Sequence, residues 1–423
     1  MRNSSTQQRR MYRNRAEIGR QGGFFPNFSS KFMLICGIGL IDSIGFLQYL
    51  LDFDQTYFYL VLIYIKIVAV MTSKWNLRAS FVAMPLIGTI LFGLLVSSAF
   101  NSVDIIDVFR VLVAAFSIVL TLVIIDGNFK TYSVGLAING FIISILYIIL
   151  YRAGSIYEAN DRLYFFNGSH PNLGGEILSV IVILSTASLR PVAFSALFTV
   201  STYCCWLMQS RTSIIAMLLS ASLYAVFWTY DRFGRIKGTL ALVVIFTFGF
   251  AYLFIGASTG SDDLAQILDF MYNSVFLVED SYRGSDTGLS GRDLHWYQTL
   301  QIIDDNFFAG AGIEYPRRLD ILQPHNWFLY PVALFGIFGF FVILAMVVAI
   351  YKVASSNAHE LVRILPIIVL LMLNDRFMNL NINPLGIYVY LFARLYQPLP
   401  NDVVYRRTSL GRPNPRASLG RSR

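Results

Sequence analysis

Residues 324–351 read PHNWFLYPVALFGIFGFFVILAMVVAIY, and this stretch shows how the chain is built. It begins with the polar residues Pro324, His325 and Asn326 and continues as an apolar run. The run is long enough to cross the roughly 30 Å hydrocarbon core of a bilayer as a helix. The whole chain has this character, since 56% of its 423 residues are hydrophobic and 14% are charged. The composition therefore predicts a polytopic membrane protein.

Other apolar runs bring the total to about twelve candidate transmembrane helices, so we expect an all-α integral membrane protein. The runs cover residues 32–51, 57–72, 81–96, 108–125, 134–150, 174–188, 192–208, 213–230, 240–255, 327–351, 361–374 and 384–396, of which the last two are short. The predicted parts are a tail at 1–31, helices 1–9 within 32–256, a large loop at 257–326, helices 10–12 within 327–396, and a tail at 397–423.

Lys and Arg gather in every second connection between the predicted helices. The inner connections of this arrangement hold Lys74, Arg78, Lys130, Arg190, Arg232, Arg235, Lys237 and Lys352. The positive-inside rule then places both termini in the cytoplasm and the large loop on the outer side, before the tenth helix.

The charges of the loop and the tails have opposite signs. Residues 257–326 carry eleven acidic residues against four basic ones, although the formal net charge of the chain is +8. Seven Lys and Arg residues lie in 1–31 and six in 397–423. Such tails are typical topogenic signals that contact anionic lipids, so we expect membrane lipids and no nucleic acid as partners.

Two charged residues fall near the middle of predicted helices, Asp42 in the first and Lys66 in the second. An unpaired charge at mid-bilayer is costly, so we expect these antiparallel neighbours to meet as an ion pair. A pair that fixes helix packing is the favoured interpretation. A proton or ion pathway is the alternative and would indicate a transporter, but the sequence shows no second row of intramembrane charges and no inverted repeat.

Several polar groups are predicted to lie on the outer side of the membrane. They are residues 167–174, Ser210 with Arg211, residues 290–293, residues 310–312 and residues 324–326. Each has an ordinary explanation, such as a capped turn around His170, a snorkelling side chain at Arg211 or a structural histidine at His325. The functional interpretation is that Arg211 binds a phosphate through bidentate hydrogen bonds and that His325 accepts a proton.

A helical apolar stripe follows the third group. Its members are Leu294, Tyr297, Leu300 and Ile303. We expect Ser290 to cap this helix and the stripe to pack on the membrane domain. Arg292 would then lie at the helix N-terminus, where its charge opposes the macrodipole unless an anion binds there.

The sequence predicts no metal site and no cofactor. The four histidines share no ligand spacing, and His359 is predicted to lie on the opposite side of the membrane. The three cysteines, Cys36, Cys204 and Cys205, lie within apolar runs and form no CxxC motif, so we interpret them as small apolar side chains.

Taken in order, the outer groups resemble the O-antigen ligase and O-antigen polymerase superfamily of bacterial envelope glycosyltransferases. The resemblance covers roughly residues 170–341. The matching residues are His170-Pro171-Asn172 with Gly174, Ser210-Arg211, Ser290-Gly291-Arg292, Gly310, Gly312, His325-Asn326, Gly336 and Gly339. Asn306-Phe307-Phe308 departs from the pattern, because the family commonly has a proline before the Gly-x-Gly.

The resemblance implies a GT-C-type, metal-independent transferase of the bacterial inner membrane with a polyprenyl-diphosphate-linked oligosaccharide as donor. Arg211 and Arg292 would neutralise the diphosphate, and His325 would be the general base. His170, Asn172 and Asn326 would bind substrate, with His170 in a positioning role.

Three functions fit the resemblance to different degrees. The leading one is a polymerase that joins lipid-linked repeat units into an O-antigen, capsule or exopolysaccharide, with a glycan as acceptor and a chain-length regulator as a candidate partner. The second is an O-antigen ligase whose acceptor is lipid A-core. A flippase or transporter for the same glycolipid is the third, and it would need intramembrane charged tracks or repeat symmetry.

Overall fold

The structure is a computed structural model of the whole chain. It describes residues 30–42, 55–72, 81–101, 105–156, 158–159, 162–166, 171–259, 292–313, 315–319, 324, 326–373 and 385–396. The chain divides into two compact units, Met1–Leu34 and Ile35–Arg423, and helix α2 (Ser30–Asp42) crosses the division. All contacts given below lie within the second unit.

The described residues are mostly helical, and two short strands accompany the helices. The helices are α2, α4 (Gln55–Thr72), α6 (Met84–Phe100), α7 (Ile105–Ile125), α8 (Phe129–Arg152), α9 (Pro171–Ser185), α10 (Pro191–Leu207), α11 (Arg211–Thr259), α13 (Arg292–Asp305), α14 (Tyr315–Arg318), α15 (Leu329–Phe335), α16 (Ile337–Ser356), the 3₁₀ turn η4 (Ala358–Glu360), α17 (Leu361–Leu373) and α18 (Leu385–Tyr396). The strands β1 (Glu158–Ala159) and β2 (Arg162–Leu163) pair antiparallel.

The helices coincide with the predicted apolar runs to within a few residues at most ends. Within the described part of the chain, four segments have the length and apolar composition to cross a membrane: Ile105–Ile125, Phe129–Arg152, Arg211–Gly234 and Ile337–Ser356. Large apolar side chains are exposed on α4, α6, α7, α8 and α16, as lipid contact requires. The prediction of an all-α membrane protein is thus confirmed, while the count of twelve spans and the GT-C type remain predictions.

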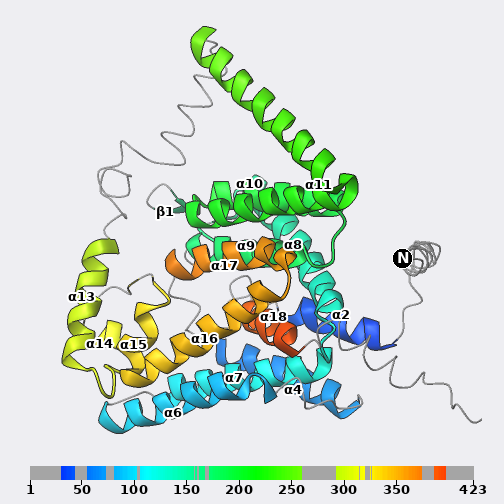
Figure 1. The fold of residues 1–423 in the computed structure, drawn as a ribbon. Helices are drawn as coiled ribbons and strands as arrows, with labels where there is room; N and C mark the ends of the chain where they lie inside the picture. The colour runs from blue at the N-terminus through cyan, green and yellow to red at the C-terminus, as the bar shows by residue number, and fades with distance from the viewer. Residues whose placement is uncertain are drawn as a thin grey trace, which may run out of the picture. The chain divides into compact units, whose positions relative to one another are not determined.

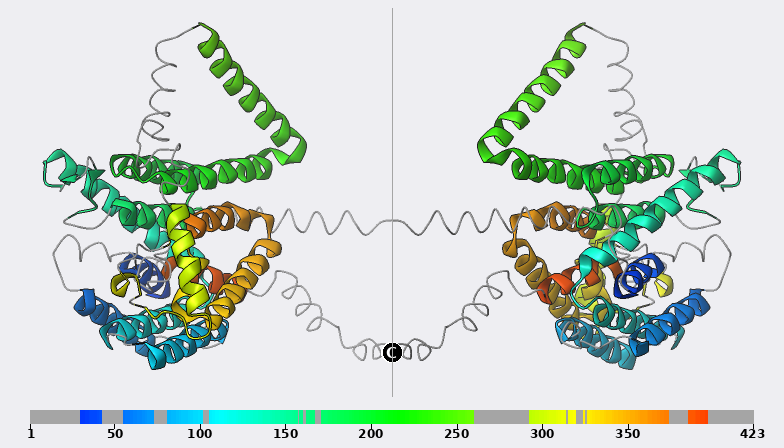
Figure 2. Two further views of the ribbon diagram at one scale, coloured as in Figure 1. Left: turned by 90° about the vertical axis from the view of Figure 1, so that its left-hand side faces the viewer. Right: turned by 90° about the vertical axis from the view of Figure 1, so that its right-hand side faces the viewer.

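Glycine residues break the helices at two places. The predicted connection between the eighth and ninth spans contains Gly234, whose backbone is not helical (φ 75°, ψ 168°). Here the two arms of α11 meet, and the second arm leaves the helices packed against the first (Figures 1 and 2). The tenth span is two helices, because the backbone of Gly336 (φ 56°, ψ −131°) ends α15 and starts α16. Glycine has no Cβ to oppose these backbone conformations.

The helices pack around α18, the last one described. It contacts α7, α8, α9 and α16, and every residue of it from Gly386 to Ala393 is buried (Figure 1). On one side of it α6 packs on α16 and α4 on α7, and on the other α11 packs on α9 and α17. A helix that is apolar all round belongs in such a buried position.

A buried polar network joins the first helices. Lys66 of α4 forms an ion pair with Asp42 of α2, as predicted, and also donates to Ser117 Oγ of α7. The second Asp42 oxygen accepts from Thr121 Oγ1 at 3.1 Å and from Tyr132 OH of α8 at 2.9 Å. The charges thus neutralise one another and tie four helices together, which is the condition under which buried ions are tolerated.

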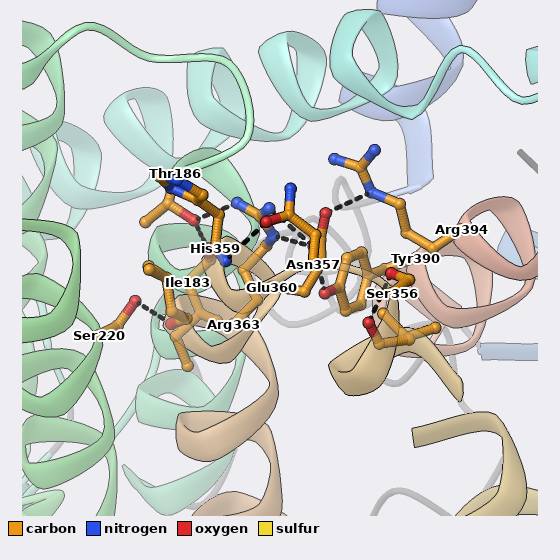
Figure 3. A network of polar contacts seen from close by, with 12 residues as sticks. Ile183, Thr186, Ser220, Ser356, Asn357, His359, Glu360, Arg363, Tyr390 and Arg394 are labelled. Atoms are coloured by element: carbon orange, nitrogen blue, oxygen red, sulfur yellow. Dashed lines mark hydrogen bonds and ion pairs between the residues drawn. The ribbon is translucent and has the colours of Figure 1, made fainter. Parts of the chain in front are cut away.

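A second buried network lies at the end of α16 that is remote from α15 (Figure 3). Glu360 Oε2 accepts from Arg363 Nη2 and from Tyr390 OH, both at 2.7 Å, and Oε1 pairs with Arg394 Nε at 3.3 Å. Arg363 Nη1 donates to Thr186 Oγ1 at 3.1 Å. The network therefore fastens α18 and the end of α9 to the start of α17.

The charge state of Glu360 follows from these contacts. Burial raises the pKa of its carboxyl. The charges of Arg363 and Arg394 and the hydrogen bonds from Tyr390 and Arg363 lower that pKa by more than burial raises it, so the net shift is downward. A carboxyl with a lowered pKa stabilises the fold while it is ionised, above its unfolded pKa of about 4.3, and loses that contribution as the pH falls through the folded value.

We predict that Asp42→Asn destabilises the protein by about 3–5 kcal/mol, because it leaves the buried Lys66 ammonium without its counter-charge. The matched control is Asp107→Asn, which makes the same change in the partly exposed Asp107–Arg110 pair (2.8 Å). That change is expected to cost less than about 1 kcal/mol. Denaturant unfolding in detergent measures both, and equal stability of the two variants would contradict the prediction.

We predict that Glu360→Gln costs about 3–5 kcal/mol at pH 7, since two guanidinium groups lose their shared carboxylate. The difference from wild type should shrink as the pH falls from about 4.3 through the lowered pKa of the folded carboxyl, because the wild-type carboxyl is protonated first in the unfolded state and then in the folded state. Unfolding curves at pH 7 and about pH 3 measure this convergence. A difference that is constant between the two pH values would show that the charge of Glu360 is not what stabilises the fold.

Candidate active site

Two helices begin side by side in the region of the predicted site. The first turns of α9 pack on the start of α11, where Gly175 is so close to Ser210 that a Cβ would collide with Ser210 Oγ. Ser210 and Ser213 are buried, and Ser210 Oγ donates to Ser213 Oγ at 2.9 Å. Arg211, the first residue of α11, and Asn172 in the first turn of α9 are both half-buried. The structure therefore brings the predicted residues Asn172 and Arg211 to one place.

The tight turn before Arg211 has a defined backbone. The amide of Ser210 donates to the Cys205 carbonyl and the amide of Gln209 to the Trp206 carbonyl, both at 2.9 Å. This is the Schellman pattern that ends a helix, with Gln209 at φ 52° in the position where glycine is usual. Two helices thus meet without a loop, which sets the position of the Arg211 backbone.

The chain before α9 also supports this corner. Phe165 and Phe166 are buried against Tyr147 of α8, and Tyr147 OH donates to the Tyr164 carbonyl at 3.1 Å. The Phe165 ring occupies the space that a side chain at Gly174 would need. Gly174 of the family pattern is therefore explained by close packing.

The second part of the site lies where the large loop rejoins the bundle. Trp296 of α13 donates its indole N–H to the Pro324 carbonyl at 2.7 Å. Asn326 Oδ1 accepts from the amides of Phe328 and Leu329 at 2.9 and 3.3 Å, so it caps α15. The amide of the buried Trp327 donates to the Leu371 carbonyl near the end of α17 at 2.9 Å.

Helix α17 relates these two parts of the site. It packs antiparallel on the first arm of α11 (Figure 1), and Ser220 Oγ donates to the Val362 carbonyl at 3.0 Å. Arg211 precedes Ser220 by nine residues and Leu371 follows Val362 by nine. At a rise of 1.5 Å per residue, Arg211 and Leu371 each lie about 14 Å from the Ser220–Val362 contact, toward the same end of the helix pair. The register thus puts Arg211 level with the carbonyl that anchors Trp327.

The Gly-x-Gly loop completes the arrangement. The amides of Ala311 and Gly312 donate to the carbonyls of Ala333 and Leu334 at 2.8 and 3.2 Å. Asn101 Nδ2 donates to the Gly310 carbonyl at 3.0 Å, which joins the end of α6 to the loop. The loop therefore covers the C-terminus of α15 with fixed backbone hydrogen bonds.

The connection that departs from the family pattern is also ordered. The Asn306 amide and Asn306 Nδ2 both lie 3.0 Å from the Ile302 carbonyl, to which they donate. The Gly310 amide then donates to the Asn306 carbonyl at 2.8 Å. An asparagine cap thus ends α13 before the Gly-x-Gly loop begins.

The prediction for the packing of α13 is wrong. Leu294, Tyr297 and Leu300 are 57%, 60% and 51% exposed, whereas Thr299 and Ile302 are 0% and 6% exposed. Both faces of the helix carry apolar side chains, so the apolar stripe does not determine which face of α13 packs against the rest of the protein. Thr299 and Ile302 define the face that turns inward.

The remaining predicted residues have the following places. Arg292 is the first residue of α13, as expected, but its side chain lies outside what the structure describes, as do Ser290, His170 and His325. In the described part of the chain, His, Cys, Asp and Glu form no group of three that could hold a metal ion.

Sequence reasoning did not find three residues that build the site. Trp296, Ser97 and Asn101 act through hydrogen bonds to backbone carbonyls that lie 28, 237 and 209 residues away. No local pattern signals such a bond. Asn101 gave the best hint, because it is a polar residue at the end of an apolar run.

We predict that Gly310→Ala is more destabilising than Gly154→Ala. Both glycines have positive φ, 75° and 67°, so each alanine variant pays about 1–2 kcal/mol of backbone strain. A Cβ at Gly310 would also collide with the Leu334 carbonyl, whereas Gly154 has open space, so Gly310→Ala should cost about 1–3 kcal/mol more. Denaturant unfolding of both variants tests this, and equal costs would mean that the loop moves freely.

Comparison with known proteins supports an assignment for this arrangement. Residues 194–344 match a family model described as O-Antigen ligase, and this stretch includes Arg211, Arg292, His325 and both glycines of the Gly-x-Gly loop. No curated protein matches the chain. The match confirms the resemblance stated from the sequence and indicates a membrane glycosyltransferase-type enzyme. Through residues 194–344, the chain is similar to the O-antigen ligase family, and this match supports the O-antigen ligase and polymerase superfamily.

Proposed function

We propose that the protein is a polymerase that joins polyprenyl-diphosphate-linked repeat units at the periplasmic face of the bacterial inner membrane. The observation that carries the proposal is the meeting of the α9 and α11 N-termini beside Arg211. Helix N-termini present unpaired amides and a partial positive charge, and a guanidinium adds a full charge. Such a place suits a diphosphate.

The donor end of the reaction depends on charge. Arg211, with Arg292 at the start of α13, holds the diphosphate through paired hydrogen bonds. As the bond between the anomeric carbon and the diphosphate oxygen breaks, the electron pair goes to that oxygen. The two guanidinium groups stabilise the charge that develops there, so the leaving group needs no proton.

The acceptor end depends on a base. An acceptor hydroxyl attacks the anomeric carbon, and His325 takes the hydroxyl proton as the new glycosidic bond forms. The products are a longer lipid-linked glycan and a polyprenyl diphosphate. The anchored positions Pro324, Asn326 and Trp327 support this role, because they hold the chain on both sides of the base.

The other predicted residues bind substrate in this proposal. Asn172 lies in the first turn of α9, which packs on the start of α11, and His170 precedes it by two residues, so we assign both to the donor pocket. Asn326 gives its two Oδ1 lone pairs to the α15 cap, which leaves its Nδ2 group as the donor to a sugar hydroxyl.

A ligase is the second candidate function, and the description of the matched family as O-Antigen ligase favours it. In that reaction the donor chemistry is the same, and lipid A-core supplies the attacking hydroxyl. A chain-length regulator would be a partner of the polymerase alone, since a ligase forms one bond per glycan transferred.

Reconstituted protein tests the proposal. We predict that liposomes with a polyprenyl-diphosphate repeat unit form a ladder of longer lipid-linked glycans without any other acceptor, and that His325→Ala forms none. Arg211→Lys should lose at least about tenfold in rate, because an ammonium cannot reproduce the bidentate geometry. Arg190→Lys is the matched control, since Arg190 is exposed at the start of α10.

Each other outcome points elsewhere. Product that forms only after lipid A-core is added would establish the ligase. Full activity of Arg211→Lys would remove the diphosphate role of Arg211. Movement of the glycolipid across the bilayer without a covalent product would replace both enzymes with a transporter.

A further inference from the structure

One described hydrogen bond connects the helix that begins with Arg292 to the residue that precedes His325. Trp296 is half-buried on α13, and its indole Nε1 lies 2.7 Å from the carbonyl oxygen of the buried Pro324. Residues four apart lie on one face of a helix, about 6 Å apart along its axis. Position 292 therefore lies one turn from the contact, on the same face of α13.

The chain after position 325 is anchored independently of Trp296. Asn326 caps α15, and the Trp327 amide donates to the Leu371 carbonyl of α17 at 2.9 Å. Pro324 has no amide hydrogen of its own to donate. On the α13 side, the hydrogen bond from Trp296 links residue 324 to the helix.

We propose that Trp296 is a positioning residue for glycosyl transfer: its indole N–H holds Pro324 so that His325 stays in register with the helix that begins at Arg292. This inference rests on the proposed function. In this inference, one hydrogen bond sets the distance between position 325, which accepts the proton, and position 292, which stabilises the leaving group. Nucleophilic transfer is sensitive to such spacing, because an error of about 1 Å can cost about a hundredfold in rate.

The bond is separable from the packing of α13. Thr299 and Ile302 are buried beneath the helix, and α13 packs on α15. These side chains keep α13 in place when the indole N–H is absent. Loss of the bond therefore frees residue 324 and leaves the helix, with Arg292, where it is.

The test uses the full chain in liposomes with the polyprenyl-diphosphate repeat unit. Trp296→Phe keeps an aromatic ring and removes the donor. We expect kcat to fall at least about tenfold while the donor KM stays within about twofold, since the base is displaced and the diphosphate contacts are retained. Trp228→Phe, the same change at an exposed position of α11, should leave kcat, KM and the melting temperature unchanged.

A double-mutant cycle distinguishes positioning from a structural role. In a His325→Ala background, followed by single turnover over long incubations, Trp296→Phe should cause no further loss, because the residue on which it acts is gone. A further loss of the same size in that background would overturn the inference. So would a wild-type kcat for Trp296→Phe, or a fall in activity that only follows a loss of folded protein.

Failure of the proposed function gives a different result. If wild-type protein forms no glycosidic product, or if His325→Ala is fully active, the proposed function fails and the inference is overturned with it. If wild type forms the ladder, His325→Ala does not, and Trp296→Phe matches wild type in kcat, the inference alone fails.

Discussion

A helix that breaks inside an apolar bundle must find new donors for the carbonyls that the break leaves unpaired, and the fold depends on how this chain does so. At the end of α15 the Leu334 carbonyl accepts from Ser97 Oγ at 3.0 Å and from the Gly312 amide. Within α17, Pro366 cannot donate to the Val362 carbonyl, and Ser220 of α11 donates to it instead. The Leu371 carbonyl, in the last turn of α17, accepts from Trp327.

These replacements explain why the candidate site lies where it does. Each interrupted helix is satisfied by a segment far away in the sequence, so the interruptions are also the points at which loops become fixed to the bundle. The Gly-x-Gly loop and the chain at Trp327 are both held by such bonds. A membrane protein of this kind can keep non-helical backbone near the bilayer where protein groups surround it, and that backbone then presents amides and side chains to a ligand.

The sequence predicted the features that follow from the high free-energy cost of placing polar groups in lipid. The apolar runs gave most helix bounds, and the charges of Asp42 and Lys66 predicted their own pairing. Arg232, Arg235 and Lys237 marked the connection between the eighth and ninth spans, and the non-helical backbone of Gly234 lies among them. The inward face of α13 was not predictable, since both faces carry apolar side chains and the structure buries Thr299 and Ile302 rather than Leu294, Tyr297 and Leu300.

The site was predictable to a lesser extent. The starts of α9 and α11, which carry Asn172 and Arg211, pack side by side, and Arg292 begins a helix, but Asn326 serves first as a cap. The family pattern specifies which residue types occur in the site. It does not specify the register between α11 and α17, because that register comes from side-chain packing over the length of both helices.

The central place of α18 bears on how the protein is made. Its 12 residues span about 18 Å, less than a bilayer, and its buried sides face other helices of the same chain. A segment so short and so enclosed gains little from lipid on its own and depends on its neighbours for insertion. The ribosome, however, synthesises those neighbours first. The helices that contact α18 therefore complete their packing only when this helix is inserted.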